Sequence, residues 1–303
     1  MKLSITYLYT IFTYGYPPKP ADDFKALADI EQMGFHSLEM EALGPEHAQG
    51  VWDNRADLKR ALADHGIHVH NFCGVDPDLV SLDEGRRKAA YERFRRVAEL
   101  GAHFDAETLH LASYAPPVEY VGRSPYALGE DYAFGDTYRT RIPNGFDWNT
   151  VWRVLVESCR YTAGVAAQYG KTIIMEPRVG EIICSVDSMI RLIDDVAMPN
   201  FRGNFDTGHF CAQRENVPLA LAKLRGRFAN VHVSDNDPKD TDHLPIGDGI
   251  IDWPEFLRVL KAQGYNGYLG LDLGNRPTLV DDLKRSAERL VALAAEQGIA
   301  LHR

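Results

Sequence analysis

Four ionisable side chains stand near the ends of four successive segments rich in β-branched and aromatic residues. They are Glu176 in TIIMEP, Asp206 in FRGNFD, His232 in ANVHVSD and Asp272 in GYLGLDL. A single acidic residue at such a position is usually a helix N-cap or an ion-pair partner, but four in register on neighbouring strands are hard to reach by accident. Three carboxylates and one imidazole suit a hard to borderline divalent cation. The pattern therefore predicts one metal site.

Further ionisable residues lie close to the same strand ends. His209 follows Asp206 in NFDTGHF, where Gly208 allows a sharp turn that would bring the imidazole back over the site. A single histidine on a strand is more often a structural residue than a functional one, and an arginine in a loop is about as often solvated as it is part of a site. The remaining candidates are Glu39 and Glu41, at the end of the second expected strand, and His70, His110 and Arg178, which are candidates for substrate binding.

The segments that would position these residues alternate along the whole chain. Strands are expected over 3–9, 36–42, 67–73, 107–112, 172–177, 201–206, 229–235 and 267–273. Apolar residues at helical spacing predict helices over 20–34, 54–66, 84–101, 149–170, 186–196, 217–226, 253–264 and 279–298. This alternation predicts an α/β fold with a parallel sheet, and the count of eight favours a single (β/α)8 TIM-barrel domain over 1–303. An open sheet that binds a dinucleotide is disfavoured, because the first turn lacks the glycine fingerprint.

One connection is much longer than the others. Residues 113–148 separate the fourth expected strand from the fourth expected helix, and loops of this length are usually lids, binding loops or contacts between subunits. Its aromatic residues would suit a sugar ring or an aglycone, or would pack the insertion against the barrel. They include Tyr114, Tyr120, Tyr126, Tyr132, Tyr138 and Trp148. We expect a lid or an interface, with Trp148 as a candidate for substrate binding.

Composition excludes several classes of partner. The formal charge is −10 and no basic run is present, which argues against nucleic acid. No apolar run approaches the roughly 18 residues of a membrane span. The opening apolar stretch has no small-residue cleavage site and is interpreted as a strand rather than as a signal peptide. The four cysteines lie far apart without a C-x-x-C pair, which predicts neither a disulfide framework nor a thiolate zinc site and fits a cytoplasmic protein.

Five motifs resemble the xylose-isomerase-like barrel superfamily, which includes sugar isomerases and epimerases, inosose dehydratases and the endonuclease IV group. They are TIIMEPR, NFDTGHF, NVHVSDND, HLPIGDGIIDW and GYLGLDL. The resemblance implies that a single divalent ion is held by Glu176, Asp206, His232 and Asp272. It also implies that His243, in HLPIGDG, lines the pocket. Two positions depart from the ketose 3-epimerases: Asp272 stands where those enzymes typically have Glu, and Pro238 stands where they tend to have Arg.

A divalent ion at an open barrel mouth can polarise a carbonyl and the neighbouring hydroxyl of a sugar. Removing the proton between them then costs less, because the enediolate is stabilised. Glu176 is both a ligand and the candidate base, and Asp272 is a ligand and a weaker acid/base candidate. His209 would hold a hydroxyl or shuttle a proton, while His243 or His110 would serve the other face.

The fate of the enediolate decides the reaction class. Return of the proton gives epimerisation or isomerisation, whereas loss of a β substituent gives elimination. Inosose dehydratases and enzymes that cleave 3-keto glycosides, including C-glycoside deglycosidases, belong to the second type. We expect an isomerase or epimerase. Three features favour the lyase alternative: the shorter side chain of Asp272 in place of Glu, Pro238 in place of Arg, and the long connection 113–148.

Two other classes are open. A phosphodiesterase like endonuclease IV would use a trinuclear zinc site, for which the histidines and carboxylates are numerous enough, but the negative charge argues against a DNA groove. A non-catalytic sugar-binding chain would leave the chemistry to a partner subunit. The expected ligands are one divalent ion, Mn²⁺ in the first place and Mg²⁺, Co²⁺ or Zn²⁺ as alternatives, and a sugar, keto-sugar or glycoside. We expect the chain to assemble either as a homo-oligomer or with a second, different subunit.

Overall fold

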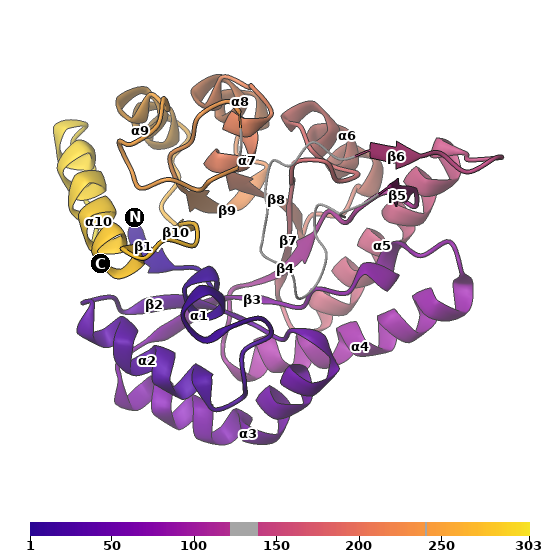
Figure 1. The fold of residues 1–303 in the computed structure, drawn as a ribbon, viewed down its shortest axis with the longest axis horizontal. Helices are drawn as coiled ribbons and strands as arrows, with labels where there is room; N and C mark the ends of the chain where they lie inside the picture. Colours follow the sequence, from indigo (N-terminus) through magenta and orange to yellow (C-terminus); the bar gives the residue numbers. More distant parts are fainter. Residues whose placement is uncertain (122–138, 240) are drawn as a thin grey trace.

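Eight parallel strands close into a barrel in the computed structural model, which describes residues 1–121, 139–239 and 241–303 (Figure 1). The strands are β1 (Lys2–Ile5), β2 (Ser37–Glu41), β3 (His68–Cys73), β4 (Thr108–Ala112), β7 (Thr172–Glu176), β8 (Phe201–Asp206), β9 (Phe228–Val233) and β10 (Tyr268–Leu271). They are hydrogen-bonded in the order β1-β10-β9-β8-β7-β4-β3-β2, and β1 also pairs with β2. The predicted (β/α)8 barrel is confirmed.

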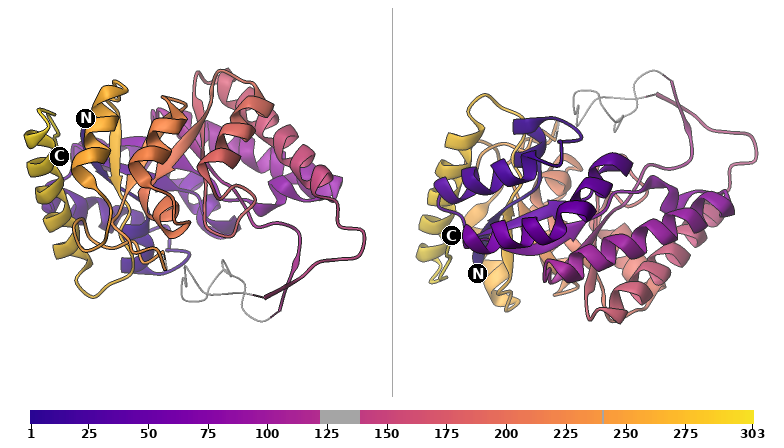
Figure 2. Two further views of the ribbon diagram at one scale, coloured as in Figure 1. Left: turned by 90° about the horizontal axis from the view of Figure 1, so that it is seen from above. Right: turned by 90° about the horizontal axis from the view of Figure 1, so that it is seen from below.

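Helices cover the outside of the barrel. They are α2 (Asp22–Gln32), α3 (Gly44–Asp64), α4 (Glu84–His103), α5 (Trp148–Gln168), α6 (Val186–Val196), α8 (Val217–Leu224), α9 (Trp253–Ala262) and α10 (Leu279–Glu296). The two views of Figure 2 show them as an outer layer around the strands. The chain ends lie side by side, because Leu3 N donates to the carbonyl of His302. No helix among the described residues combines the length and the apolar character that crossing a bilayer requires.

Two details differ from the sequence-based expectation: the end of the first strand, and the path of the chain after the sixth strand, β8. The first strand stops at Ile5, and a short helix, α1 (Leu8–Tyr14), occupies residues that were expected to extend it. The hydroxyl of Tyr9, within α1, donates to Asp29 (2.9 Å), and that of Tyr7, the N-cap residue of α1, donates to Asp23, so contacts with α2 hold this β-favouring segment in a helix. After Asp206 the chain enters helix α7 (Thr207–Ala212) directly rather than turning at Gly208.

The long connection is only partly described. Its described parts form an antiparallel pair outside the barrel, β5 (Glu119–Val121) and β6 (Arg139–Arg141), in which Tyr120 is opposite Thr140 (Figures 1 and 2). Tyr114 is buried and accepts a backbone hydrogen bond from Ile182. The candidates Tyr126, Tyr132 and Tyr138 lie outside the described residues. A short 3-10 helix, η1 (Pro77–Val80), follows β3.

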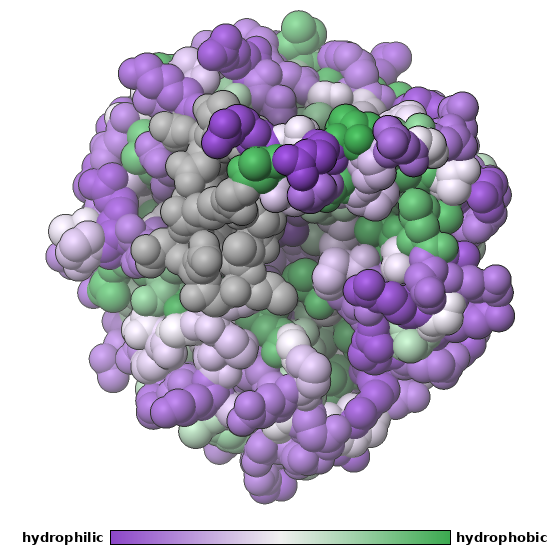
Figure 3. Space-filling view, turned by 45° about the vertical axis from the view of Figure 1, so that its right-hand side comes forward, coloured by the Kyte–Doolittle hydropathy of each residue, from purple (hydrophilic) through white to green (hydrophobic). Residues whose placement is uncertain are grey.

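The apolar core lies between the strands and the helices, and Phe205 is at its centre near the site. Side chains alternate along β8, so Asn204 and Asp206 point into the barrel while Phe205 points outward. Its ring is fully buried against the rings of Phe210 (4.7 Å between centroids), Phe256 (5.9 Å) and Phe228 (6.3 Å). This cluster ties β8 to α7, β9 and α9. The face seen in Figure 3, in contrast, is mostly hydrophilic, with apolar residues in small patches.

We expect Phe205→Ala to lower the free energy of unfolding by about 3–5 kcal/mol, because it removes a ring from a close-packed cluster. Urea unfolding followed by circular dichroism measures the change. Leu219→Ala, at a side chain that is 59% exposed, is the matched control and should change stability by less than about 0.5 kcal/mol. Equal small effects of the two substitutions would show that the aromatic cluster does not stabilise this side of the barrel.

Candidate active site

Three of the four predicted metal ligands come together at the carboxyl ends of their strands. Oxygens of Glu176 and Asp206 and a ring nitrogen of His232 all lie within 4.8 Å of one another, and all three residues are buried. His232 Nδ1 is 2.7 Å from Glu176 Oε1 and 3.6 Å from Asp206 Oδ2. Neither contact has hydrogen-bond geometry, and Asp206 Oδ2 has no hydrogen-bond partner among the described residues. Three buried ligand atoms thus converge in ion-pair contact but without a hydrogen bond between them.

The fourth predicted ligand, Asp272, lies in an adjoining group. It comes within ligand spacing of Asp206 and His243 rather than of Glu176 and His232. Its Oδ2 is 3.0 Å from His243 Nδ1, and its carbonyl oxygen is 2.9 Å from the same nitrogen. Asp206 is therefore shared by both groups, and Asp272 is directed toward His243.

The orientation of His232 is set from below by Glu39. His232 Nε2 is 3.0 Å from both carboxylate oxygens of Glu39, whereas the other ring nitrogen, Nδ1, is the one near Glu176 and Asp206. Since a carboxylate accepts and Nε2 must donate, Nδ1 is the nitrogen left to face Glu176 and Asp206. Metal-binding histidines are commonly oriented by a carboxylate in this way. Glu39 was considered from its strand position, but its link to His232 was not predicted.

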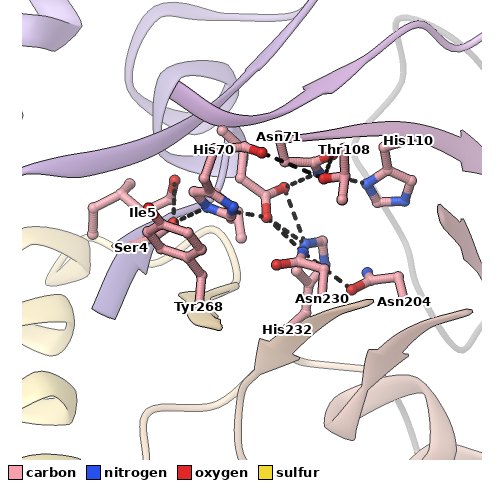
Figure 4. A network of polar contacts seen from close by, with 12 residues as sticks. Ser4, Ile5, His70, Asn71, Thr108, His110, Asn204, Asn230, His232 and Tyr268 are labelled. Atoms are coloured by element: carbon pink, nitrogen blue, oxygen red, sulfur yellow. Dashed lines mark hydrogen bonds and ion pairs between the residues drawn. The ribbon is translucent and has the colours of Figure 1, made fainter. Parts of the chain in front are cut away.

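Amide side chains connect Glu39 to Glu176 across the barrel interior. Asn230 Nδ2 donates to Glu39 Oε1 (2.9 Å) and to Asn204 Oδ1 (3.2 Å), and Asn204 Nδ2 donates to Glu176 Oε1 (2.9 Å). Asn71 Nδ2 donates to the other oxygen of Glu39 at 3.0 Å (Figure 4). The two carboxylates on either side of His232 are therefore held in place by fixed donors.

This network also determines which ring nitrogen of His110 carries the hydrogen. Asn71 Nδ2 is 3.2 Å from His110 Nδ1, and the Asn71 oxygen accepts from Thr108 Oγ1 at 2.7 Å, which identifies the nitrogen of Asn71 as the donor. His110 Nδ1 thus accepts, and Nε2 carries the hydrogen. Burial lowers the pKa of His110 and keeps the ring neutral. A neutral N–H donor then faces the cavity, 3.9 Å from Glu176 Oε2.

His70 lies below the cavity instead of in it. Its Nε2 is 2.6 Å from Ser4 Oγ, and its ring stacks on Tyr268 with 4.1 Å between centroids (Figure 4). Burial lowers the pKa of His70 to about 4. The structure therefore places this substrate-binding candidate in the barrel interior, with Nε2 3.6 Å from Glu39.

Charges around the ligand group are balanced by pairing. Burial alone would lower the pKa of His232, but the carboxylates of Glu39, Asp206 and Glu176 outweigh it and hold that pKa well above the usual range. Burial alone would raise the pKa of Glu176, but His232 outweighs it and holds that pKa well below the usual range. A protonated His232 thus supplies the positive charge that these carboxylates require, and a cation placed among them would supply the same charge.

The cavity above the ligand group is lined by both ionisable and apolar residues. The ionisable lining residues are Glu39, Glu41, His110, Glu176, Arg178, His209, His232, His243 and Asp272. The larger apolar and aromatic lining residues are Tyr7, Leu8, Ile11, Tyr16, Leu43 and Val75. Trp148 is not among the lining residues; it starts α5, its side chain is 38% exposed, and it lies beside Phe146. Arg178 is 3.9 Å from Glu176 Oε2 and pairs with Glu181 at 2.9 Å.

Asp206 and His209 are placed by helix α7. Asp206 caps the helix through Oδ1, which accepts from the backbone N–H of His209 at 2.8 Å, and Oδ2 is thereby left toward His232. A Cβ on Gly208 would stand 2.5 Å from Ser234 Oγ, so glycine is needed here for close approach rather than for a turn. The ring of His209 meets that of His243 edge to face, with 5.1 Å between centroids.

The HLPIGDGIIDW segment is organised by the buried Asp235. One carboxylate oxygen accepts from Gly247 N (2.8 Å) and from Trp253 Nε1 (2.9 Å), and the other accepts from Ile251 N (3.1 Å). A Cβ at Gly249 would lie 2.4 Å from the carbonyl oxygen of Asn236. The glycines and the tryptophan therefore hold a tight loop that carries His243 to the cavity.

Comparisons with known proteins agree with this architecture. The family model described as xylose isomerase-like TIM barrel matches residues 27–295. The fructoselysine 3-epimerase of Escherichia coli O157:H7 is 26% identical over 155 residues, which are 49% of this chain and 56% of that enzyme. The chain thus spans about half the length of the first curated relatives it matches. The L-ribulose-5-phosphate 3-epimerase UlaE of Salmonella heidelberg is 22% identical over 90% of this chain and 86% of its own length.

Solved structures show the same fold at low sequence identity. A D-tagatose 3-epimerase-like protein has a TM-score of 0.74 and 19% identity, with 98% of each chain covered. The 3-keto-D-glucoside 4-epimerase YcjR from E. coli has a TM-score of 0.73 and 19% identity, with 96% of this chain and 99% of that chain covered. With the family model matching most of its length, this chain belongs to the xylose isomerase-like TIM barrel family.

Proposed function

We propose that this protein is a divalent-metal-dependent isomerase or epimerase that removes the proton next to the carbonyl of a sugar or keto-sugar. The observation that carries the proposal is the convergence of Glu176, Asp206 and His232 Nδ1 on one point, with Nε2 of the same ring bound by Glu39. Relatives that act as sugar epimerases support it. The low identities leave the substrate as part of the proposal.

The ligand atoms fit a divalent cation. Two carboxylates and one imidazole, with Asp272 within reach of the shared Asp206, are oxygen and nitrogen donors of the kind that Mn²⁺ accepts, and Mg²⁺, Co²⁺ and Zn²⁺ are alternatives. The strongest sign is Asp206 Oδ2, which accepts no hydrogen bond from the described residues and lies 3.6 Å from His232 Nδ1, because a buried carboxylate oxygen is costly unless a positive charge is close to it. Such an ion would polarise the substrate carbonyl and stabilise negative charge on its oxygen.

Glu176 would act as the base in this proposal. Its Oε1 accepts from Asn204 and faces the ligand group, whereas its Oε2 is near His110 and Arg178 at the cavity. A carboxylate oxygen at this position can accept the α proton of a bound sugar. The Nε2–H of His110 would donate to a substrate oxygen, and His209 and His243 would hold hydroxyls on the other side of the cavity.

Elimination is the second candidate, because Asp272 is paired with His243 and the cavity lining includes apolar and aromatic residues that would contact an aglycone. A trinuclear site of the endonuclease IV type is less well supported. His70 would be needed near the mouth, but it lies below the cavity against Ser4.

Glu176→Gln should reduce turnover by at least about 100-fold, since the amide cannot accept the α proton. Steady-state rates on a substrate identified in the panel below measure this, with Glu157→Gln on the exposed face of α5 as the control. A Glu176→Gln enzyme that keeps its metal and its full turnover would refute the assignment of the base.

Glu39→Gln should weaken Mn²⁺ binding by about 10–100-fold, because it removes the carboxylate that orients His232. Calorimetric titration of chelator-treated protein with Mn²⁺ measures the affinity, and Glu92→Gln at an exposed position of α4 is the control. Unchanged affinity would show that Glu39 does not support a metal ligand.

The reaction class can be read from incubation of the Mn²⁺-loaded enzyme in D₂O with ketoses, inososes and 3-keto glycosides. We expect solvent deuterium at the carbon next to the carbonyl and a new epimer or isomer without cleavage. Release of an aglycone or of water would establish the lyase alternative. The metal content should be about one ion per chain, whereas three zinc ions would indicate the nuclease type.

A further inference from the structure

Glu41 occupies a place in the cavity to which the mechanism above gives no role. It is the last residue of β2, and by strand alternation it points into the barrel like Glu39, one layer nearer the mouth. It lines the cavity together with Tyr7 and Cys73. In the order of the closed barrel, β2 lies diametrically opposite β8, which carries Asp206. Glu41 thus faces the ligand group across the space for substrate.

The carboxyl group of Glu41 is not committed to another residue. Within the described part of the chain it forms no hydrogen bond or ion pair, and its paired neighbour on β3 is the thiol-bearing Cys73. Burial, reinforced by the nearby carboxylates of Glu39, Glu176 and Asp272 and opposed by Arg178, raises the pKa of Glu41 to about 8. At neutral pH this residue therefore carries a proton that it can donate to whatever fills the cavity.

Asp272, the second acid/base candidate from the sequence, is less well placed. Its strand, β10, adjoins β9, so its carboxylate is on the same side of the barrel as the ligand group. That carboxylate also contacts His243 at 3.0 Å and lies within ligand spacing of Asp206. A group that returns a proton to the other face of a planar intermediate must stand on the other wall, as Glu41 does.

We infer that Glu41 is the second proton-transfer residue of the site and that it returns a proton to the enediolate from the wall opposite the ligand group. This inference rests on the proposed function. Glu176 takes the α proton, the C–H electron pair forms the C=C bond, and the carbonyl electron pair moves onto oxygen. The C=C pair then takes the proton of the Glu41 carboxyl group and the carbonyl re-forms. Glu41 is left as a carboxylate and Glu176 as an acid, and exchange with solvent resets both.

The test separates proton removal from proton return. With a panel substrate in D₂O and bound Mn²⁺, Glu41→Gln should form product at least about 100-fold more slowly than the wild type. Exchange of the α proton of the substrate for deuterium should continue within a few-fold of the wild-type rate, because Glu176 is intact. Glu46→Gln, at an exposed position shortly after β2, is the matched control and should leave both rates unchanged. Metal content and melting temperature verify that the variants are loaded and folded.

The other possible results distinguish a failure of the role of Glu41 from a failure of the proposed function. Unchanged product formation by Glu41→Gln, or equal loss of exchange and product formation, would overturn the role of Glu41 while leaving the proposed function in place. A wild-type enzyme that exchanges no proton with any panel substrate would overturn the proposed function itself, and cleavage in place of epimerisation would overturn proton return.

The wild type also gives a check without a variant. Early product should carry solvent deuterium at the reprotonated carbon. Retention of the original protium there would contradict proton removal and proton return by two separate residues.

Discussion

The contact between Glu39 and His232 is the constraint on which the site depends. It joins side chains that are 193 residues apart in the chain and buries a carboxylate and an imidazole inside the barrel. Burying such groups is costly unless each has a partner. Here Asn71 and Asn230 donate to the Glu39 oxygens, and the remaining ring nitrogen of His232 is turned toward Glu176 and Asp206. One buried pair thereby decides which atom is presented at the barrel mouth.

The rest of the fold separates stability from chemistry. The interior of a TIM barrel is commonly filled by bulky apolar side chains, but the interior next to this site contains buried polar residues such as Asn71, Asn204 and Asn230. Stability on this side comes instead from the layer between strands and helices, where Phe205 packs among other rings. Alternation along a single strand serves both purposes, because Phe205 faces the helices while its two neighbours face the barrel interior. The polar residues of the barrel interior can then position the side chains at the barrel mouth, while the apolar layer outside the strands stabilises the fold.

The sequence predicts the barrel well, because the 2-residue and 3.6-residue periods and the short connections are local properties. The ligand group follows from the barrel, since carboxyl ends of parallel strands meet at one rim, and the structure brings Glu176, Asp206 and His232 together there. The link from Glu39 to His232 could not be predicted in this way, because strand pairing alone does not place β2 and β9 side chains in contact across the interior. The same limit applies to His70, whose contact with Ser4 and stacking on Tyr268 depend on depth in the barrel. Helix α1 was missed because tyrosine hydroxyl contacts with α2 override a local preference for strand.

In the proposed site, one divalent ion binds through Nδ1 of His232 together with Glu176 and Asp206. Anomalous diffraction from crystals of the protein grown with Mn²⁺ would locate that ion. We expect a single strong peak per chain within coordination distance of those three atoms, with His232 Nε2 still bound to Glu39. A peak elsewhere, a peak on Nε2, or no peak at a saturating Mn²⁺ concentration would refute this metal site.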